Sequence, residues 1–408
     1  MFVLTLLALL FAGAIAHSYL LYPWIVRRTV RASSPPPAPA AAPSNYPDVH
    51  VLMAVHNEEA VLPQKLASLL AQDYPGTLRF YVGSDNSTDA TNAILTEFER
   101  NTGARSQVRR FGKRQGKPAI INQLAELAGT DGCYLLTDAS VMLQPGTVTA
   151  LIDALLAHPG AAVVDARVVH TGLADSGISK SEDLYIGREV ALKHDEGRAW
   201  GAMMGPFGGC WLLRAAAFRP VPDNFLVDDF YLCMSAYEAG GRGVSALDAV
   251  VTEGVGQSVA GEFRRKARIG AGNWQNLVRF RKLWWPFWRS PLHFAFFSHK
   301  VLRWWTPLLL IGLLSSLVGR ALLAGGNHSY WWPVALVAGL PLLGYLADVL
   351  LSALGLRWPP LRHLRYFLAM NAALLVGLLR YLNGIQTNVW QPSTRHPHPG
   401  PDRPANDG

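Results

Sequence analysis

A carboxylate and a hydroxyl group at the end of an apolar run are the first side chains of this sequence that could do chemistry. Asp138 and Ser140 follow the apolar run 134–137. If that run is a buried strand, both side chains stand at its carboxyl end, where an open α/β sheet places its ligands. There they could hold a divalent cation against a diphosphate, because Mg²⁺ binds through few protein oxygens and the phosphates of its substrate. A lone aspartate after a strand is more often a helix cap, so the other motifs must decide.

A pair of adjacent carboxylates, Asp228 and Asp229, offers a second kind of chemistry. An ionised carboxylate can accept the proton of an attacking hydroxyl group. Both residues also precede an apolar stretch, 230–239, which Gly240 and Gly241 end, so they could instead cap a helix. Two adjacent side chains cannot both face one substrate from a regular helix start. One of them is therefore expected to support the other.

Cationic side chains could meet an anionic ligand at two places. Lys117 closes a basic loop, 113–117, that contains glycine and leads into a helical pattern. Such a loop suits a diphosphate, although a solvated loop of this composition is common. Arg265 and Arg268 lie at helical spacing shortly before Trp274. They could stabilise a departing diphosphate or, alternatively, face anionic lipid.

The elements that must position these groups are strand–loop–helix units. Strand-like runs at 50–55 and 78–82 each end in a polar loop, and helical patterns over 61–70 and 90–100 come next. Two such units in succession build a parallel sheet whose loops cluster at one edge. Further strands are expected at 161–169, at 211–214 and up to Glu253, which would place an acid at the edge of the site.

Two of the loops have more than one interpretation. Asp85, in the loop 83–89, could bond a nucleobase or a ribose, whereas the end of that loop is equally typical of a helix cap. The stretch Met203–Cys210 contains Gly208 and Gly209, which would allow the backbone to approach a ligand closely. A tight turn before the next strand explains these glycines equally well.

The apolar residues of this 408-residue chain are concentrated at its two ends. Hydrophobic residues make up 50% of the chain and charged residues 16%, which is typical of a membrane-associated protein. The net charge of +8 comes from basic residues beside the apolar segments, so membrane orientation explains it and no nucleic-acid partner is expected. Cys133, Cys210 and Cys233 lack paired spacing, which favours a reducing, cytosolic environment over a disulfide or zinc site.

Taken together and in order, these motifs resemble the large family of inverting, nucleotide-sugar-dependent glycosyltransferases, family 2, which includes membrane-bound polysaccharide synthases. The resemblance covers roughly residues 51–275. Each motif is weak alone, but their order along the chain is specific. The motifs are residues 55–59, residues 84–89, Gly116 with Lys117, Asn122, residues 137–140, and Asp228 with Asp229.

The resemblance implies a GT-A fold, an α/β nucleotide-diphospho-sugar transferase domain, and a role for each motif. Asp229 would be the general base with Asp228 in support. Asp138, with Ser140 where the family usually has a second aspartate, would bind Mg²⁺ or Mn²⁺. Gly208, Gly209, Glu253, Arg265, Arg268 and Trp274 would line the acceptor or diphosphate region. The donor nucleotide would be held by His56, Asn57, Glu58, Glu59, Asp85, Lys117 and Asp138.

The expected layout begins with an uncleaved transmembrane anchor, residues 1–25, because arginines follow this apolar run rather than precede it. A cleaved signal peptide is the alternative. Four spans in all would place the catalytic domain in the cytoplasm of a bacterial-type inner membrane and both termini outside. The further boundaries are a Pro/Ala-rich linker 26–47, the GT-A domain 48–275, an interfacial amphipathic segment 276–292, about three transmembrane helices in 293–384, and a tail 385–408 expected to be disordered at its end.

The expected activity is transfer of a sugar from a nucleotide donor, a UDP-sugar, to a lipid-linked or polysaccharide acceptor with inversion. A processive polysaccharide synthase is the first alternative. The family's Gln-x-x-Arg-Trp box is replaced here by Arg265–Arg268 followed by Ile269, which makes that alternative weaker. With few spans, such a synthase would need a partner subunit or a homodimer. A non-catalytic membrane scaffold that binds nucleotide sugars is the second alternative, and Ser140 is the residue that keeps it open.

Overall fold

The computed structural model describes residues 1–32, 45–171, 179–254, 259–325, 327–356 and 358–385, with 387 and 389. Most of the predicted Pro/Ala-rich linker and the tail from Gln391 lie outside the described residues. The chain divides into two compact units. One, the catalytic unit, comprises residues 34–175, 193–258 and 385–408. The other, the apolar unit, comprises residues 1–33, 176–192 and 259–384, and each is described by itself.

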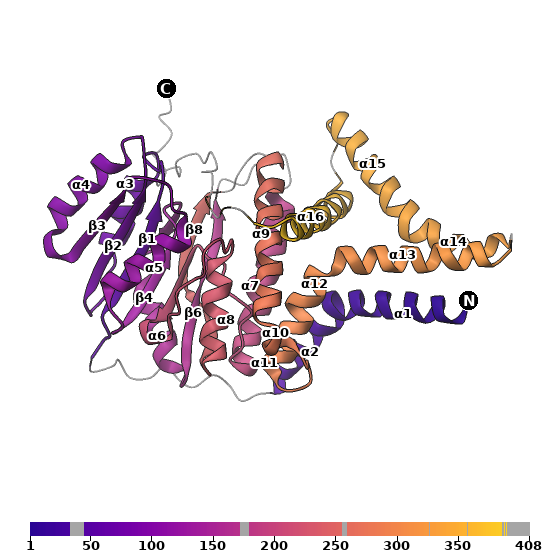
Figure 1. Ribbon diagram of the computed structural model, residues 1–408, viewed down its shortest axis with the longest axis horizontal. Coiled ribbons are helices and arrows are strands. Elements are labelled where there is room, and N and C mark those ends of the chain that lie inside the picture. The colour runs from indigo at the N-terminus through magenta and orange to yellow at the C-terminus, as the bar shows by residue number, and fades with distance from the viewer. Residues whose placement is uncertain are drawn as a thin grey trace, which may run out of the picture. The chain divides into compact units, whose positions relative to one another are not determined.

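The catalytic unit is built on one eight-stranded sheet in the order β3-β2-β1-β4-β7-β6-β8-β5 (Figure 1). The first four of these strands are parallel, and β7 runs antiparallel between β4 and β6. All seven residues of β1 are buried, as expected for a parallel strand with both faces of its sheet covered. The strands are β1 (Val49–Val55), β2 (Leu78–Asp85), β3 (Ser106–Phe111), β4 (Cys133–Thr137), β5 (Val141–Leu143), β6 (Ala161–Thr171), β7 (Cys210–Arg214) and β8 (Arg242–Gly254).

Amphipathic helices connect these strands and cover the sheet. Gly83 of β2 allows close packing, because a Cβ atom there would lie 2.3 Å from the side chain of Ile120. The expected strand–loop–helix order from β1 to β4 is observed, and two strands that the sequence did not predict, β3 and β5, form the two edges of the sheet. The helices are α3 (Leu62–Leu70), α4 (Thr91–Thr102), α5 (Lys117–Ala128), α6 (Thr147–Ala157) and α8 (Asp228–Glu238), while α7 (Ser179–Trp200) crosses from one unit to the other.

The apolar unit consists of helices, several of them long. Within the part of the chain that the structure describes, four continuous helical stretches are long and apolar enough to cross a membrane, at Phe2–Ala32, Thr306–Leu323, His328–Ala353 and Pro359–Leu382. They coincide with the four predicted spans. The helices are α1 (Phe2–Ala16), α2 (Tyr22–Ala32), α9 (Val259–Arg279), α10 (Arg281–Trp284), α11 (Pro291–Ala295), α12 (Leu302–Trp304), α13 (Thr306–Leu323), α14 (Trp332–Val334), α15 (Leu340–Ala353) and α16 (Pro359–Leu382).

Candidate active site

The carboxyl end of β4 leads into a tight turn. The strand ends at Thr137, and the amide of Val141 donates to the carbonyl oxygen of Asp138 at 3.3 Å. The alternation of a strand therefore does not continue to Ser140, and Asp138 and Ser140 both follow the carboxyl end of the strand. The chain continues from Asp138 into this turn and strand β5, not into a helix, so the helix-cap interpretation fails. The Asp138 side chain is 41% exposed and can reach a ligand.

Lys117 brings three distant parts of the sequence together. It is the first residue of α5, directly after Gly116 with its left-handed φ of 87°. Its Nζ atom lies 2.7 Å from Oδ1 of Asp138 and 3.9 Å from Oδ2 of Asp228. Burial alone would lower the pKa of Lys117, but these two carboxylates raise it. The predicted diphosphate, metal and base motifs therefore meet around one ammonium group.

The acidic pair occupies the first turn of α8. Val227 is the N-cap residue, and Oδ1 of Asp229 accepts a hydrogen bond from the amide of Phe230 at 2.7 Å. The helix-cap interpretation does not explain the surroundings of Asp229. Burial and then the charge of Asp228 raise the pKa of Asp229 to about 7. A carboxylate with this pKa suits a general base near neutral pH.

In the glycine stretch before β7, both the backbone conformation and a close contact require glycine at position 208. Its φ is 84°, and a Cβ atom there would lie 2.1 Å from Oδ2 of Asp229. The turn before β7 is observed, whereas the close approach at Gly208 involves a protein group, so contact of this stretch with a ligand stays a prediction. The group that approaches is the predicted base itself. The carbonyl of Gly209 accepts hydrogen bonds from the amide of Asp138 and the hydroxyl of Thr137, both at 3.0 Å, which ties the glycine stretch to the turn.

The loops that follow β1 and β2 are joined by hydrogen bonds. Oε2 of Glu59 accepts from the amide of Ala90 at 2.8 Å, and Oδ2 of Asp89 accepts from the amide of Glu59 at 3.1 Å. In the same way, Oδ1 of Asn57 accepts from the amide of Thr88 at 2.8 Å. These side chains shape the loops that the resemblance assigns to the donor. Their direct contact with a nucleotide remains a prediction.

Asp85 is fully buried and organises the loop that precedes Lys117. Its carboxylate pairs with Arg114 at 3.0 Å and accepts from the amides of Gln115 and Gly116 at 2.7 and 3.1 Å. Its own carbonyl bonds the ring of His56 at 2.8 Å. In this conformation the carboxylate of Asp85 faces protein groups, so its contact with the nucleoside also remains a prediction. The amide of Glu58 contacts Thr91 Oγ1 at 2.9 Å, again between the two loops.

The remaining predicted residues divide between the units. Glu253 lies near the end of β8 and pairs in register with Val141, directly after the turn. Arg265, Arg268 and Trp274 lie on α9, which belongs to the apolar unit. There Trp274 stacks on Trp305 with ring centroids 6.3 Å apart. Within the catalytic unit, therefore, the structure gathers Lys117, Asp138, Asp228, Asp229 and Gly208.

Sequence reasoning missed Lys65, a fully buried lysine on α3. Its Nζ atom donates to Oγ1 of Thr137 at 2.7 Å and to the carbonyl oxygen of Val141. It thereby fastens both ends of the turn that contains Asp138. Burial lowers the pKa of Lys65 to about 8. The available signal was its place in the helix pattern, because residue 65 falls on the face that carries Leu62 and Leu69.

The acidic groups fit one kind of metal site. Among the residues that the structure describes, no three His, Cys, Asp or Glu side chains gather around a common point. A cation held wholly by such side chains does not fit here. One exposed carboxylate, Asp138, does fit an ion such as Mg²⁺ or Mn²⁺ that keeps several waters and binds substrate phosphates. Ser140 lies in the same turn and adds a hydroxyl oxygen.

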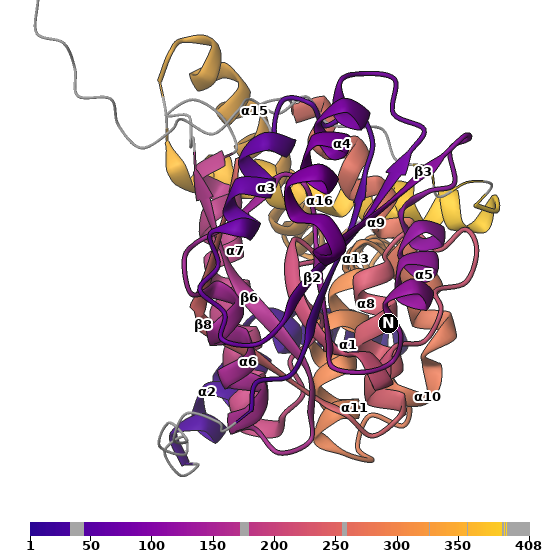
Figure 2. The same cartoon turned by 90° about the vertical axis from the view of Figure 1, so that its left-hand side faces the viewer.

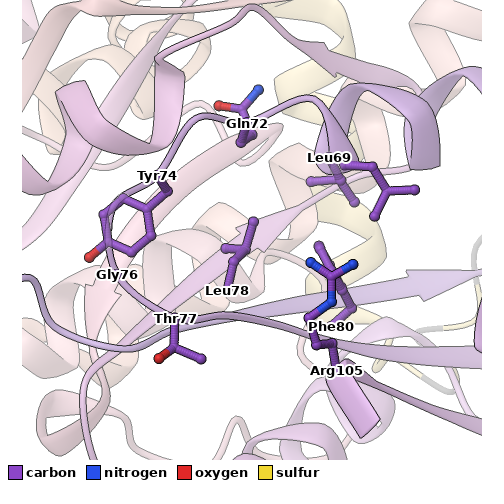
Figure 3. A pocket seen from close by; sticks show the side chains of 9 residues that line it. Leu69, Gln72, Tyr74, Gly76, Thr77, Leu78, Phe80 and Arg105 are labelled. Carbon is purple, nitrogen blue, oxygen red and sulfur yellow. The ribbon is translucent and has the colours of Figure 1, made fainter. Parts of the chain in front are cut away.

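A pocket of about 220 Å³ opens elsewhere in the catalytic unit (Figure 3). Tyr74, Leu78 and Arg105 are among its lining residues, and Leu78 is the first residue of β2. The pocket therefore lies at the amino end of this strand, whereas Asp138 follows the carboxyl end of the parallel strand β4. This pocket is not part of the candidate site.

Comparison with known proteins gives two kinds of similarity. Residues 50–221 match the family model described as Glycosyl transferase family 2. An N-acetylglucosaminyltransferase of Rhizobium meliloti is 25% identical over 348 residues, which are 75% of this chain and 74% of that protein. The beta-monoglucosyldiacylglycerol synthase of Synechocystis sp. is 38% identical over 89 residues, which are 21% of this chain and 18% of that protein.

A solved structure shows the same fold. The mannosyltransferase PcManGT from Pyrobaculum calidifontis, in complex with GDP-Man and Mn²⁺, superimposes with a TM-score of 0.67 at 19% identity, covering 93% of this chain and 99% of that one. The expected GT-A fold is thereby confirmed. The sheet, the acidic and basic groups at its edge and the matched family model agree, and residues 50–221 are assigned to a family 2 glycosyltransferase domain.

Proposed function

We propose that this enzyme is anchored in the membrane and moves a sugar from a nucleotide-sugar donor, a UDP-sugar, to a lipid-linked or polysaccharide acceptor with inversion. The observation that carries the proposal is the convergence on Lys117 of Asp138 and Asp228, with Asp229 seated against Gly208. These groups stand at the carboxyl edge of the sheet, where open α/β folds bind ligands.

Asp229 acts as the general base in this proposal. Its carboxylate takes the proton of the acceptor hydroxyl, and the oxygen attacks the anomeric carbon from the face opposite the diphosphate. The bond from that carbon to the diphosphate oxygen breaks, and its electron pair leaves with the nucleoside diphosphate. A pKa of about 7 supports this role, because the group is ionised near neutral pH and still basic enough to accept the proton.

Lys117 and Asp138 serve the leaving group. The pKa of Lys117 is raised, so its ammonium stays charged and can face the diphosphate. Asp138, with Ser140 beside it, would hold Mg²⁺ or Mn²⁺ shared with the diphosphate, and such an ion stabilises the negative charge of the departing nucleotide. Gly208 has no Cβ atom, so the carboxylate of Asp229 can lie directly against its backbone.

The names of the relatives narrow the first donors and acceptors to test. The Rhizobium meliloti relative is an N-acetylglucosaminyltransferase, and the Synechocystis relative is named for the synthesis of a glucosylated diacylglycerol. N-acetylglucosamine and glucose donors and a lipid acceptor are therefore the first choices. The apolar helices support membrane anchoring, and the arginines at 27, 28 and 31, in the last turns of the first of them, support a cytoplasmic catalytic unit.

Processive synthesis is the second candidate. The N-acetylglucosaminyltransferase relatives and the apolar helices support it, whereas the missing Gln-x-x-Arg-Trp box speaks against it. The two candidates differ in their products. A single transfer gives one glycosylated acceptor, and a processive enzyme gives a ladder of lengths while shorter acceptors are still in excess.

The test is release of the nucleoside diphosphate from a panel of UDP-sugars by the full chain in detergent, with Mg²⁺ or Mn²⁺. We expect turnover with one donor and a loss of about 10³-fold in Asp229→Asn, within the usual contribution of a general base. Asp223→Asn is the matched control, because Asp223 is an exposed carboxylate shortly before α8. Full activity in Asp229→Asn would refute the assignment of the base, and nucleotide binding without turnover of any donor would contradict the proposed donor class.

A further inference from the structure

Helix α16 runs across the other long helices of the apolar unit. In Figure 1 α1 and α13 lie beside each other in the plane of the picture, whereas α16 is seen nearly end-on, and in Figure 2 it is seen from its side. The packing agrees, since α1 packs along α13 while α16 packs mainly on α9. If α1 and α13 cross the bilayer, α16 is directed along the membrane surface.

The composition of α16 also differs from that of a spanning helix. Between Arg365 and Arg380 the uncharged stretch, residues 366–379, has 14 residues. At about 1.5 Å per residue this is about 21 Å, against about 30 Å of hydrocarbon in a bilayer. The mean hydropathy of the α16 window is 1.2, whereas that of the first helix, Phe2–Ala32, is 2.0.

The contact between α16 and α9 is close and lies near the far end of α16. A Cβ atom on Gly377 would lie 2.7 Å from the amide nitrogen of Ala271, and one on Gly270 would lie 3.4 Å from the Cα atom of Gly377. Gly377 is 18 residues beyond Pro359, or about 27 Å along the helix. If α16 crossed the bilayer, this contact would carry α9 towards the opposite leaflet. Such a position is costly, because Arg264, Arg265, Lys266 and Arg268 precede Gly270 on α9.

One face of α16 carries an apolar stripe, whose members are half-buried at 361, 368 and 375 and exposed at 372, 379 and 382. Leu379 and Leu382 are 53% and 68% exposed. Cationic groups stand at both ends of the helix, and at the first end Arg365 pairs with Asp348 of α15 at 2.8 Å. A helix with cations at both ends and one apolar face is suited to the boundary between headgroups and acyl chains. The stripe consists of Leu361, Leu368, Ala372, Leu375, Leu379 and Leu382, at helical spacing.

We propose that α16 is an interfacial helix whose apolar stripe docks into the acyl chains of the leaflet on the side of the catalytic unit. Length and composition allow four spans. The orientation of α16, its short uncharged stretch and its contact with α9 argue against the fourth span. Three spans then remain, formed by Phe2–Ala32, Thr306–Leu323 and His328–Ala353. The carboxyl terminus then lies on the same side of the membrane as the catalytic unit. This inference rests on the membrane anchoring proposed above.

Topology reporters on the full chain in cells test the proposal. Alkaline phosphatase, active outside, and green fluorescent protein, fluorescent inside, are fused at Gly325, at Gly355 and at the carboxyl terminus. We expect Gly325 outside and both other sites inside. A carboxyl terminus outside with Gly355 inside would establish a fourth span and overturn the proposal. All three sites inside would contradict the spans Thr306–Leu323 and His328–Ala353, and with them the membrane anchoring by these helices, so the two failures differ.

Depth measurements on single cysteine variants test the same point without a fusion. Leu361→Cys, Ala372→Cys and Leu382→Cys carry a fluorescent label along the stripe, and lipids brominated at different depths quench it. The native thiols at 133, 210 and 233 are buried, so labelling favours the new site. We expect equal depths for the three labels. A label at 372 deeper than the others by about 16 Å, which is 11 residues of helix, would indicate a span. Leu308→Cys, Ile311→Cys and Leu322→Cys on α13 are the spanning control.

Discussion

Two lysines contact the turn that contains Asp138, and their surroundings shift their pKa values in opposite directions. Lys117 lies 2.7 Å from the carboxylate of Asp138 and 3.9 Å from that of Asp228, which raise its pKa. Lys65 has no exposed surface and bonds two uncharged oxygens, on Thr137 and Val141, and burial lowers its pKa to about 8. The same residue type therefore has opposite pKa shifts at a single turn.

This difference indicates that Lys117 takes part in the reaction, whereas Lys65 stabilises the turn. An ammonium that faces carboxylates at a partly exposed site can exchange them for a diphosphate when substrate arrives. A buried ammonium that bonds a hydroxyl and a carbonyl cannot reach a ligand, but it holds α3 to both ends of the turn. We therefore expect substitution of Lys117 to alter the reaction and its pH dependence, and substitution of Lys65 to alter chiefly the pH dependence of stability.

Between the two lysines the larger effect is expected for Lys117→Met, which removes the charge but keeps an unbranched side chain. Loss of a cation that faces the diphosphate should lower kcat/KM by about 10²-fold, similar to the loss of one preorganised group that stabilises developing charge. Rates of nucleotide release measure it. Arg109→Met, which removes an exposed cation from β3, is the control and should keep the wild-type rate.

The pH profile distinguishes a charge effect from a general disturbance. The wild-type rate should rise with pH through about 7 as Asp229 loses its proton. The positive charge of Lys117 lowers the pKa of Asp229, so Lys117→Met should move the midpoint to higher pH. A profile with an unchanged midpoint and a uniformly lower rate would show that Lys117 does not act on the base through its charge.

A smaller loss is expected for Gly208→Ala, with Gly240→Ala as its matched control. Both glycines have a left-handed φ, 84° and 89°, so both substitutions should cost about 1–2 kcal/mol of stability. Only the Cβ atom at 208 would collide with Asp229, because the position at 240 has no atom within 4 Å. Activity per folded molecule should fall by at least about tenfold in the first variant alone, since displacement of a catalytic group is costly. Equal activity in the two variants would show that Gly208 serves only the turn.

Much of the fold could be predicted because the inner strands are distinct in sequence. The parallel strands β1 and β4 are almost uninterrupted apolar runs followed by polar loops, and this pattern is typical of a sheet covered on both faces. The edge strands were missed for the opposite reason. β3 is largely polar and partly exposed, and β5 has only three residues, so neither has a recognisable period.

The residues of the site could be predicted better than their contacts. The order of motifs identified Lys117, Asp138 and the acidic pair, yet sequence alone could not tell that Asp85 faces a loop rather than solvent. The direction of a carboxylate depends on which amides the folded chain brings near it. Lys65 was missed because a lysine in a helix is normally exposed, and only tertiary packing supplies its two acceptors.

Lys65→Met should have the smallest effect on the reaction and the most specific effect on stability. The folded protein releases the Lys65 proton at about pH 8, whereas an unfolded lysine keeps it to about 10.5. The unfolded chain then binds more protons between these values, so the wild type should gain stability relative to Lys65→Met as pH rises from about 8 to 10.5. The gain would be on the order of 3 kcal/mol, because each pH unit between these two values contributes about 1.4 kcal/mol.

Unfolding of the full chain in detergent at several pH values measures this difference. Lys113→Met, at an exposed lysine, should run parallel to the wild type over the same range. Parallel curves for Lys65→Met as well would mean that the buried ammonium keeps an ordinary pKa. The distinction between the two lysines would then rest on their contacts alone. At pH 7 Lys65→Met should retain at least about a tenth of the wild-type rate, because Lys65 reaches the turn only through oxygens that do not meet the substrate.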